Sequence, residues 1–82
     1  MSEPLRFRVR ILRKPEIADP EGATTARALR DLGYDVVEVR FGREILVELP
    51  PGDADEAEAA VHEMCERLLA NPIIEDYDVE RL

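Results

Sequence analysis

The stretch LRFRVRI, residues 5–11, decides the fold more than any other part of this 82-residue sequence. Apolar residues and arginines alternate along it, which is the period of a β-strand with one buried and one exposed face. We therefore predict a strand whose inner face is apolar. Its outer face carries a row of guanidinium groups from Arg6, Arg8 and Arg10.

Three further segments have the pattern of strands. Residues 37–41 and 45–49 alternate in the same way, and the residues Phe41-Gly42-Arg43 between them predict a tight turn that makes the two strands a hairpin. The last strand is predicted over residues 73–79, after an Asn-Pro break at residues 71–72. Proline and the residue before it disfavour helix, so the preceding helix must stop there.

Two helices separate these strands. The first is predicted over residues 20–32 with Asp19 as its N-cap, and the second over residues 54–70 with Asp53 or Asp55 as its N-cap. At helical spacing, the second helix presents one apolar stripe. The stripe consists of Ala57, Val61, Met64, Cys65, Leu68 and Leu69.

The resulting order is β-α-β-β-α-β in a single domain, residues 1–82. With right-handed crossovers this order predicts a ferredoxin-like α+β layer, in which an antiparallel sheet carries both helices on one face. The strands would run fourth, first, third, second across the sheet. The arginines of the first strand would then lie between carboxylates on both sides, from Asp76, Asp78 and Glu80 and from Glu44 and Glu48.

Two interpretations of this charged face stay open. It is either a solvated ladder of opposite charges that fixes the strand register, or a surface that docks on a partner. Leu46 interrupts the polar alternation on the outer face of the third strand, which hints at a contact there.

Composition limits the class of partner. A formal net charge of −8 and a pI near 4.6 argue against binding of nucleic acid or anionic membranes, because like charges repel. The outward strand positions also lack the aromatic rings on which an RNA-recognition module stacks bases. One cysteine excludes an intrachain disulfide, and no leader or membrane-crossing run is evident. We therefore expect a cytoplasmic protein.

Few residues could carry chemistry. His62 and Cys65 lie three apart on the second helix, as in a thiolate–imidazole pair or half a metal site. However, they are the only histidine and cysteine, and Cys65 falls in the apolar stripe, so packing is the favoured interpretation. The acidic runs at residues 53–58 and 75–80 are interpreted as helix caps and ladder partners. We predict no catalytic residue, no cofactor site and no metal site in this chain.

Three segments resemble the PurS family, the small subunit of phosphoribosylformylglycinamidine (FGAM) synthase. They are KPEIADPEG at residues 14–22, VRFGREI at residues 39–45 and MCERLLANPIIEDY at residues 64–77. They occur in the family's order and spacing, and the resemblance extends over nearly the whole chain. The third is the most specific, because a helix end, an Asn-Pro stop and an Ile-Glu-Asp-Tyr strand start seldom occur together. Mild departures from the usual family residues occur at Glu16, Glu21 and Arg43.

The resemblance implies a role in purine biosynthesis. The complete synthase is a carbon–nitrogen ligase that uses glutamine and ATP to convert formylglycinamide ribonucleotide to formylglycinamidine ribonucleotide. In the family, a synthetase subunit, PurL, holds the ATP, magnesium and substrate, and a glutaminase subunit, PurQ, releases ammonia. PurS is expected to bridge the two as a dimer and to aid ammonia transfer, without a bound cofactor. A tetramer is the alternative for the isolated chain.

Candidate partner-interface residues lie on the arginine row, in the loop that follows it, and around the Asn-Pro break. They are Arg6, Arg8, Arg10, Lys14, Asp19, Arg40, Arg43, Asn71, Ile73, Ile74 and Tyr77. A competing hypothesis is a free-standing ACT-like sensor of small molecules, which has the same element order. Such a sensor usually has a glycine-bearing loop after its first strand, whereas the loop here, residues 13–22, is stiffened by two prolines and carries acidic residues.

Overall fold

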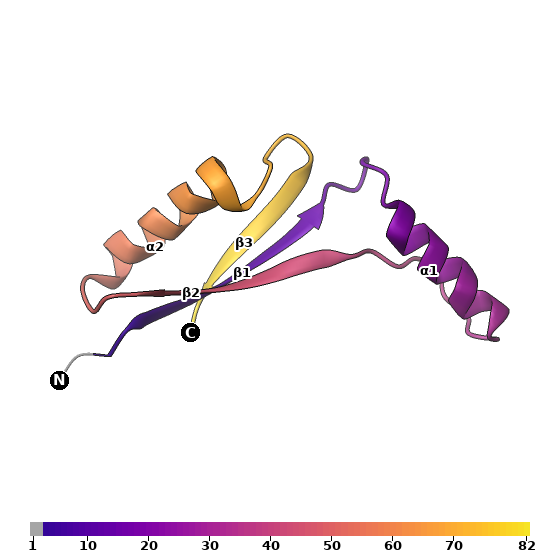
Figure 1. Ribbon diagram of the computed structural model, residues 1–82, viewed down its shortest axis with the longest axis horizontal. Helices are drawn as coiled ribbons and strands as arrows, with labels where there is room; N and C mark the ends of the chain where they lie inside the picture. Colours follow the sequence, from indigo (N-terminus) through magenta and orange to yellow (C-terminus); the bar gives the residue numbers. More distant parts are fainter. Residues whose placement is uncertain (1–2) are drawn as a thin grey trace.

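The computed structural model describes residues 3–82 as a three-stranded antiparallel sheet with one helix packed on it and a second helix held away from it (Figure 1). The elements are β1 (Leu5–Arg13), α1 (Pro20–Asp31), β2 (Gly42–Leu49), α2 (Ala54–Met64), the π-helical turn η1 (Cys65–Leu69) and β3 (Glu75–Arg81). The predicted α+β class and antiparallel sheet are confirmed.

β1 is the central strand, and the sheet order is β2-β1-β3. Arg6 lies opposite Glu48 of β2, and Arg8 lies opposite Glu80 of β3. This is the order and register predicted for the first, third and fourth strands. A slip of one residue would turn the arginines of β1 into the core, so the alternation in the sequence specifies this register.

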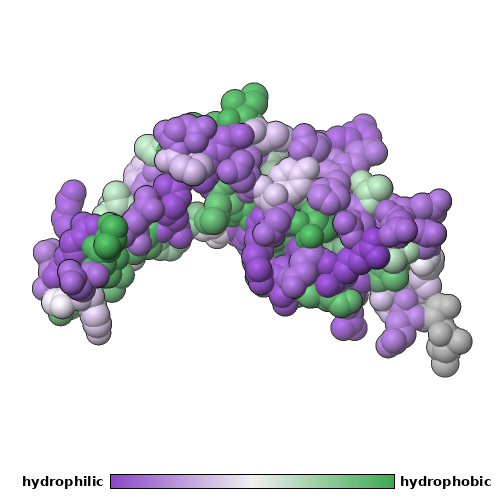
Figure 2. Space-filling view, turned by 180° about the vertical axis from the view of Figure 1, so that it is seen from behind, coloured by the Kyte–Doolittle hydropathy of each residue, from purple (hydrophilic) through white to green (hydrophobic). Residues whose placement is uncertain are grey.

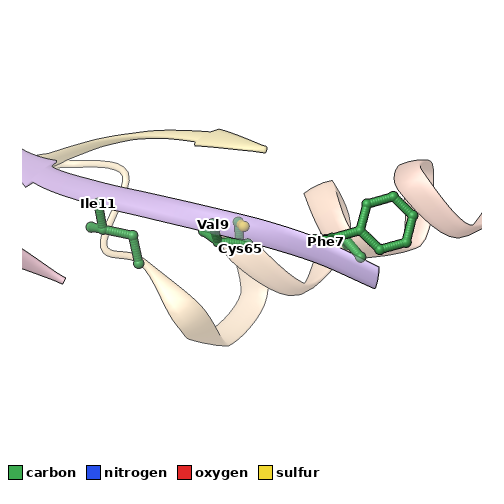
Figure 3. Packing of buried hydrophobic residues seen from close by; sticks show 5 residues of the cluster. Phe7, Val9, Ile11 and Cys65 are labelled. Carbon is green, nitrogen blue, oxygen red and sulfur yellow. The ribbon is translucent and has the colours of Figure 1, made fainter. Parts of the chain in front are cut away.

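The core forms between β1 and the helix that follows β2. Phe7, Val9 and Ile11 of β1 are at most 1% exposed and pack against Val61 of α2 and Cys65 of η1 (Figure 3). Removing side chains of this size from water stabilises the fold by about 1.5–3 kcal/mol each. These five residues therefore hold the sheet and the second helix together.

The core covers only part of the sheet. α2 packs on β1 and β3, whereas the inward residues of β2 are only half-buried. These residues are Ile45, Val47 and Leu49. The half of the inner face that β2 contributes therefore lacks the second helix that a ferredoxin-like layer would place there.

The predicted strand over residues 37–41 is wrong. Gly42 and Arg43 are already paired with β1, so they cannot form the tight turn that would fold a hairpin back. The chain instead runs back along α1 through residues 34–41 and enters β2 directly (Figure 1).

The prediction that both helices share one face of the sheet is also wrong, because α1 lies beyond the end of the sheet (Figure 1). Polar contacts tie α1 to the returning chain. Asp19 accepts hydrogen bonds from the N–H groups of Gly22 at 3.0 Å and Phe41 at 2.7 Å. Arg30 donates to the carbonyl oxygens of residues 36 and 37 at 2.7 and 2.8 Å. These bonds hold α1 against the segment that precedes β2, and both lie beyond the end of the sheet.

We call residues 15–41 the side lobe. It makes the molecule elongated, with extents of 53 × 28 × 14 Å and a radius of gyration of 16.6 Å. A compact domain of this length would have a radius of gyration of about 12 Å. The side lobe therefore projects from the small body formed by the sheet and α2.

The predicted starts of both helices are confirmed, whereas the predicted α-helical end of the second is wrong. α1 spans Pro20–Asp31 after its Asp19 cap, and Gly33 lies just beyond its C-cap with a φ of 100° that suits glycine. α2 begins after its Asp53 cap but ends at Met64, and the π-helical turn η1 takes the place of the last α-helical turns predicted up to residue 70. One residue of the predicted apolar stripe is misplaced: Leu68 is 84% exposed. It lies in η1, where the wider π-helical turn rotates side chains away from the α-helical phase.

Candidate partner interface

The arginine row forms a ladder of ion pairs across the outer face of the sheet. Each guanidinium lies near a carboxylate of a neighbouring strand: Arg6–Glu48 at 2.9 Å, Arg8–Glu80 at 3.0 Å, Arg8–Glu44 at 3.6 Å and Arg10–Glu44 at 3.5 Å. The side chain of Arg8 is only 29% exposed. The geometry therefore favours the charge-ladder interpretation, since the three arginines are engaged within the chain.

Reversing the central charge tests the ladder. Arg8→Glu would place three carboxylates together with Glu44 and Glu80, and we expect the free energy of unfolding to fall by about 1–2 kcal/mol. Urea denaturation measures this change. The charge-swapped double variant Arg8→Glu/Glu80→Arg should recover part of the loss. Unchanged stability in the single variant would show that the ladder does not help to fix the sheet.

The loop residues of the candidate set close the base of the side lobe. Arg40 donates to the carbonyl oxygens of Arg13 at 2.9 Å and Lys14 at 3.0 Å. The ammonium group of Lys14 lies 3.5 Å from a carboxylate oxygen of Asp76. Both cations therefore bind the chain itself.

Asp19 has a similar internal role. The N–H groups of Phe41 and Gly22 hold the pKa of the Asp19 carboxyl below its ordinary value. Both acceptor oxygens are thus used to join the start of α1 to the end of the returning segment. Asp19 shapes the side lobe rather than offering a free carboxylate to a partner.

The Asn-Pro corner, residues 70–75, is organised by one carboxylate. Glu75 accepts hydrogen bonds from the Asn71 N–H at 2.8 Å and from the Arg43 guanidinium at 3.0 and 3.2 Å. Arg43 also donates to the carbonyl oxygen of Leu69 at 3.0 Å. The Asn71 N–H and then Arg43 lower the pKa of Glu75. Together these bonds fix the direction in which the chain leaves η1 and enters β3.

Hydrophobic and aromatic candidates lie in and after this corner. Ile73 is 82% exposed, whereas Ile74 is half-buried and its carbonyl oxygen accepts from the Lys14 N–H at 2.9 Å. The Tyr77 hydroxyl donates to Glu66 at 2.6 Å, which raises the pKa of Tyr77 to about 12. Of these three side chains, Ile73 is the one presented to solvent.

Several exposed apolar residues were missed from the sequence. In residues 3–82, large hydrophobic side chains outside the candidate set are exposed chiefly on the side lobe and in η1; they include Leu32, Tyr34, Val37 and Leu68. Three of them were assigned to a helix or strand that would bury one face. The apolar periodicity of the sequence marks such residues as one face of a helix or strand. Periodicity does not identify the surface that packs on this face.

The described residues offer little for chemistry. Burial raises the pKa of the Cys65 thiol, which is the opposite of what a thiolate nucleophile needs. The His62 ring instead lies 6.0 Å from the Tyr77 ring. Within residues 3–82, no three His, Cys, Asp or Glu side chains gather as a metal site would require. No helix in that range has the length and apolar character to cross a membrane.

Comparison with known proteins identifies the family. The PurS family model, described as phosphoribosylformylglycinamidine (FGAM) synthase, matches residues 6–82. The chain belongs to the PurS family. It is 42% identical over 67 residues to phosphoribosylformylglycinamidine synthase subunit PurS of Archaeoglobus fulgidus, which covers 80% of this chain and 84% of that protein. The resemblance predicted from the three sequence segments is therefore confirmed.

Two solved structures from Thermotoga maritima share the fold. The PurS subunit of its phosphoribosylformylglycinamidine synthase matches with a TM-score of 0.90 and 31% identity, over 100% of this chain and 95% of that chain. A chain in the structure of the T. maritima PurLQS matches with a TM-score of 0.89 and 32% identity, over 98% and 99%. Because the likeness extends over the full length, it includes the projecting side lobe of this PurS chain.

Proposed function

We propose that this chain is the bridging subunit of an FGAM synthase. It joins the glutaminase subunit to the synthetase subunit as a dimer, aids the passage of ammonia between them, and contributes no catalytic group of its own. The observation that carries the proposal is the likeness, over 98% of the chain, to a chain in the T. maritima PurLQS structure. The cytoplasm is the expected compartment of such an enzyme.

The described side chains support an architectural role. The polar candidates bind within the chain, where they set the strand register, the base of the side lobe and the Asn-Pro corner. The large apolar side chains of Ile73 and Val37 are exposed and have no such role. Rigid turns that present apolar residues suit contact with other subunits better than they suit bond-making.

The division of labour assigns the cofactors elsewhere. ATP and magnesium would be used by the synthetase subunit, and glutamine would be hydrolysed by the glutaminase subunit. The role of this chain in the assembly is structural. No contact among residues 3–82 favours the ACT-like sensor, which would predict a rise in melting temperature when an amino acid is added.

Omission from a reconstituted synthase tests the proposal. Purified synthetase and glutaminase are mixed with and without this chain, and FGAM formation is measured with glutamine or with ammonium as the nitrogen donor. We expect omission to lower the glutamine-dependent rate about tenfold or more, equivalent to about 1.4 kcal/mol, while the ammonium-dependent rate is retained. The reason is that only the glutamine reaction needs the two subunits to be joined.

Variants of the chain check that it is not catalytic. Cys65→Ala and His62→Gln remove its only thiol and imidazole, and both variants should restore the glutamine-dependent rate to the wild-type level. A glutamine-dependent rate that is the same with and without the chain would contradict the bridging role. Loss of restoration in the folded His62→Gln variant would contradict the non-catalytic role.

A further inference from the structure

The strand β3 has one free edge. It is the last strand in the order β2-β1-β3, so only one side of its backbone pairs with β1. At the two ends of this pairing, the Leu82 N–H donates to the carbonyl oxygen of Arg6 at 3.0 Å, and the Lys14 N–H donates to that of Ile74 at 2.9 Å. Backbone groups in an antiparallel pair alternate in direction from residue to residue. The even-numbered residues of β3 therefore face β1, and its odd-numbered residues face away from the sheet.

The outward backbone groups of β3 are available to another strand. They belong to Tyr77, Val79 and Arg81, and within residues 3–82 their N–H groups have no hydrogen-bond acceptor. The side chains of Tyr77 and Arg81 bind Glu66 and Glu58 and so hold the second helix over the inner face of β3. These contacts do not use the backbone of the edge. An exposed edge of this kind is a template for an added strand.

Charges on the outer face of the sheet stand in columns of alternating sign. The column on β2 is acidic, the column on β1 is basic, and the column on β3 is acidic again. The β3 column consists of Asp76, Asp78 and Glu80, which are all exposed. Opposite charges on neighbouring strands attract. The sheet therefore ends at this edge on an acidic column, which a basic column on an added strand would match.

Asp78, at the centre of the β3 column, is open to a cation from another chain. Arg10 lies opposite Asp78 in the strand register, but its guanidinium lies 3.5 Å from Glu44 and 3.9 Å from Glu80. Among residues 3–82, Asp78 makes no ion pair. In Figure 2, hydrophilic side chains predominate over the body formed by the sheet and α2. A partner at this edge is thus selected by charge and by backbone pairing.

We propose that the free edge of β3 docks an extended, basic segment of another protein. The segment adds a strand beside residues 77–81, and Lys or Arg side chains at its alternate positions lie opposite the acidic column of β3. Main-chain hydrogen bonds give the affinity, and the column gives the preference for a basic sequence. This edge is on the opposite side of the sheet from β2. The proposal goes beyond the bridging role and does not depend on it.

The charge of the edge disfavours other occupants. If β3 of a second copy paired antiparallel with this edge, with the outer faces aligned, acidic residues would lie opposite acidic residues in every register that overlaps the column. Like charges directly opposite each other are destabilising. The net charge of −8 repels nucleic acid and anionic membranes. A basic extended segment is the occupant that matches both the backbone and the charge.

Binding of a short peptide tests the docking. The probe is fluorescein-labelled Arg-Thr-Arg-Val-Arg-Thr-Arg, whose cations alternate at strand spacing, and the control peptide has the same composition with its arginines in one block. By fluorescence anisotropy at low salt, we expect the alternating peptide to bind about tenfold more tightly than the control peptide. Equal affinities would show unspecific attraction of charge and overturn the proposal. So would the absence of binding up to about 1 mM peptide.

Hydrogen exchange locates the bound strand. With saturating alternating peptide, the amide protons of Tyr77, Val79 and Arg81 should exchange about tenfold more slowly or less, because they gain acceptors. The amide protons of Asp78 and Glu80 face β1 and should change little. Binding of the peptide without protection of the outward amide protons would overturn the strand pairing.

Two substitutions of equal charge separate the edge from the overall charge. Asp78→Lys places a cation at the centre of the column and should weaken binding of the alternating peptide about tenfold. Glu63→Lys changes the net charge equally at an exposed position of α2, where Glu63 pairs with Arg67, and should change the affinity by about twofold at most. Equal weakening by the two variants would overturn the proposal.

A proline at the edge tests the backbone bonds. Val79→Pro removes an outward N–H group without removing a hydrogen bond to β1, and edge strands tolerate such a proline. If circular dichroism shows a folded variant, we expect no binding of the alternating peptide, and retained binding would overturn the strand pairing. If the variant does not fold, the hydrogen-exchange result decides the same point. These tests use the isolated full chain, so their result is separate from that of the synthase reconstitution.

Discussion

Replacing Glu75 with glutamine is expected to lower the free energy of unfolding by about 2 kcal/mol, because hydrogen bonds to charged groups contribute about 1.5–3 kcal/mol. The carboxylate binds both the Asn71 N–H and the Arg43 guanidinium, and its side chain is 11% exposed. In the variant, an amide group replaces one of the acceptor oxygens. For a domain of this size the loss corresponds to a fall in melting temperature of about 10 °C, measured by circular dichroism.

The control is the same substitution in an exposed pair. Glu63→Gln removes the carboxylate that accepts from Arg67 on the surface of the second helix at 3.0 Å. Exposed pairs of this kind contribute about 0.3–0.5 kcal/mol, so the melting temperature should change little. Equal effects of the two variants would show that Glu75 does not organise the Asn-Pro corner.

Because the pKa of Glu75 is lowered, the stability that its carboxylate contributes depends on pH. The folded-state pKa is lowered from an ordinary value of 4.5, so its contribution is fully present above that value and is lost as the pH falls through the folded pKa. We expect wild type to lose stability below about pH 4.5 more steeply than Glu75→Gln. The difference between the two proteins should therefore shrink as acid is added.

Gly22→Ala is expected to lower the melting temperature by about 10 °C as well. A Cβ atom at this position would lie 2.1 Å from the carbonyl oxygen of Val39, a backbone atom that cannot swing aside. Overpacking of this kind costs about 1–3 kcal/mol, and the helix propensity of alanine offsets up to about 1 kcal/mol. We place the net loss at about 2 kcal/mol, with hydrogen exchange rising first in α1.

Gly52→Ala is the matched control. No atom lies within 4 Å of a Cβ built at Gly52, so this variant should be neutral or slightly more stable than wild type. If Gly22→Ala were instead as stable as Gly52→Ala, α1 could not be packed against the returning segment. The account of the side lobe would then be wrong.

The fold was predictable from sequence wherever local chemistry decides it. Alternating arginines fixed the central strand and its register, because a slip would bury charge. Asp19 and Gly33 marked the ends of α1, since their roles depend on the backbone of one turn. Placement of α1 was not predictable, because a hairpin closed within one chain and an open extended segment have the same pattern of alternation.

For the candidate interface as well, some features could be predicted from the sequence and others could not. The family resemblance was found from sequence, and it led to the correct family. Most of the selected polar residues, such as Arg43 and Arg40, proved to bind the chain itself. A charged residue in a short motif can serve either a turn or a partner, and sequence spacing does not separate the two. Of the selected apolar and aromatic residues, Ile73 is the one that the structure leaves exposed.

The polar contacts of this chain stiffen its corners, and several large apolar side chains outside its core, such as Ile73 and Val37, stay exposed. The arginine ladder, the Asn-Pro corner and the base of the side lobe each hold one geometry. A stiff unit of this kind can position two larger proteins relative to each other with little loss of conformational entropy on binding.

Sedimentation of the three purified subunits is the decisive test of the bridging role. Glutaminase and synthetase are sedimented together with and without this chain, at micromolar concentration and with glutamine, ATP and magnesium present. We expect glutaminase to move with the synthetase when the chain is added and to sediment separately when it is absent. Co-sedimentation of the two large subunits to the same extent without the chain would contradict the bridging role.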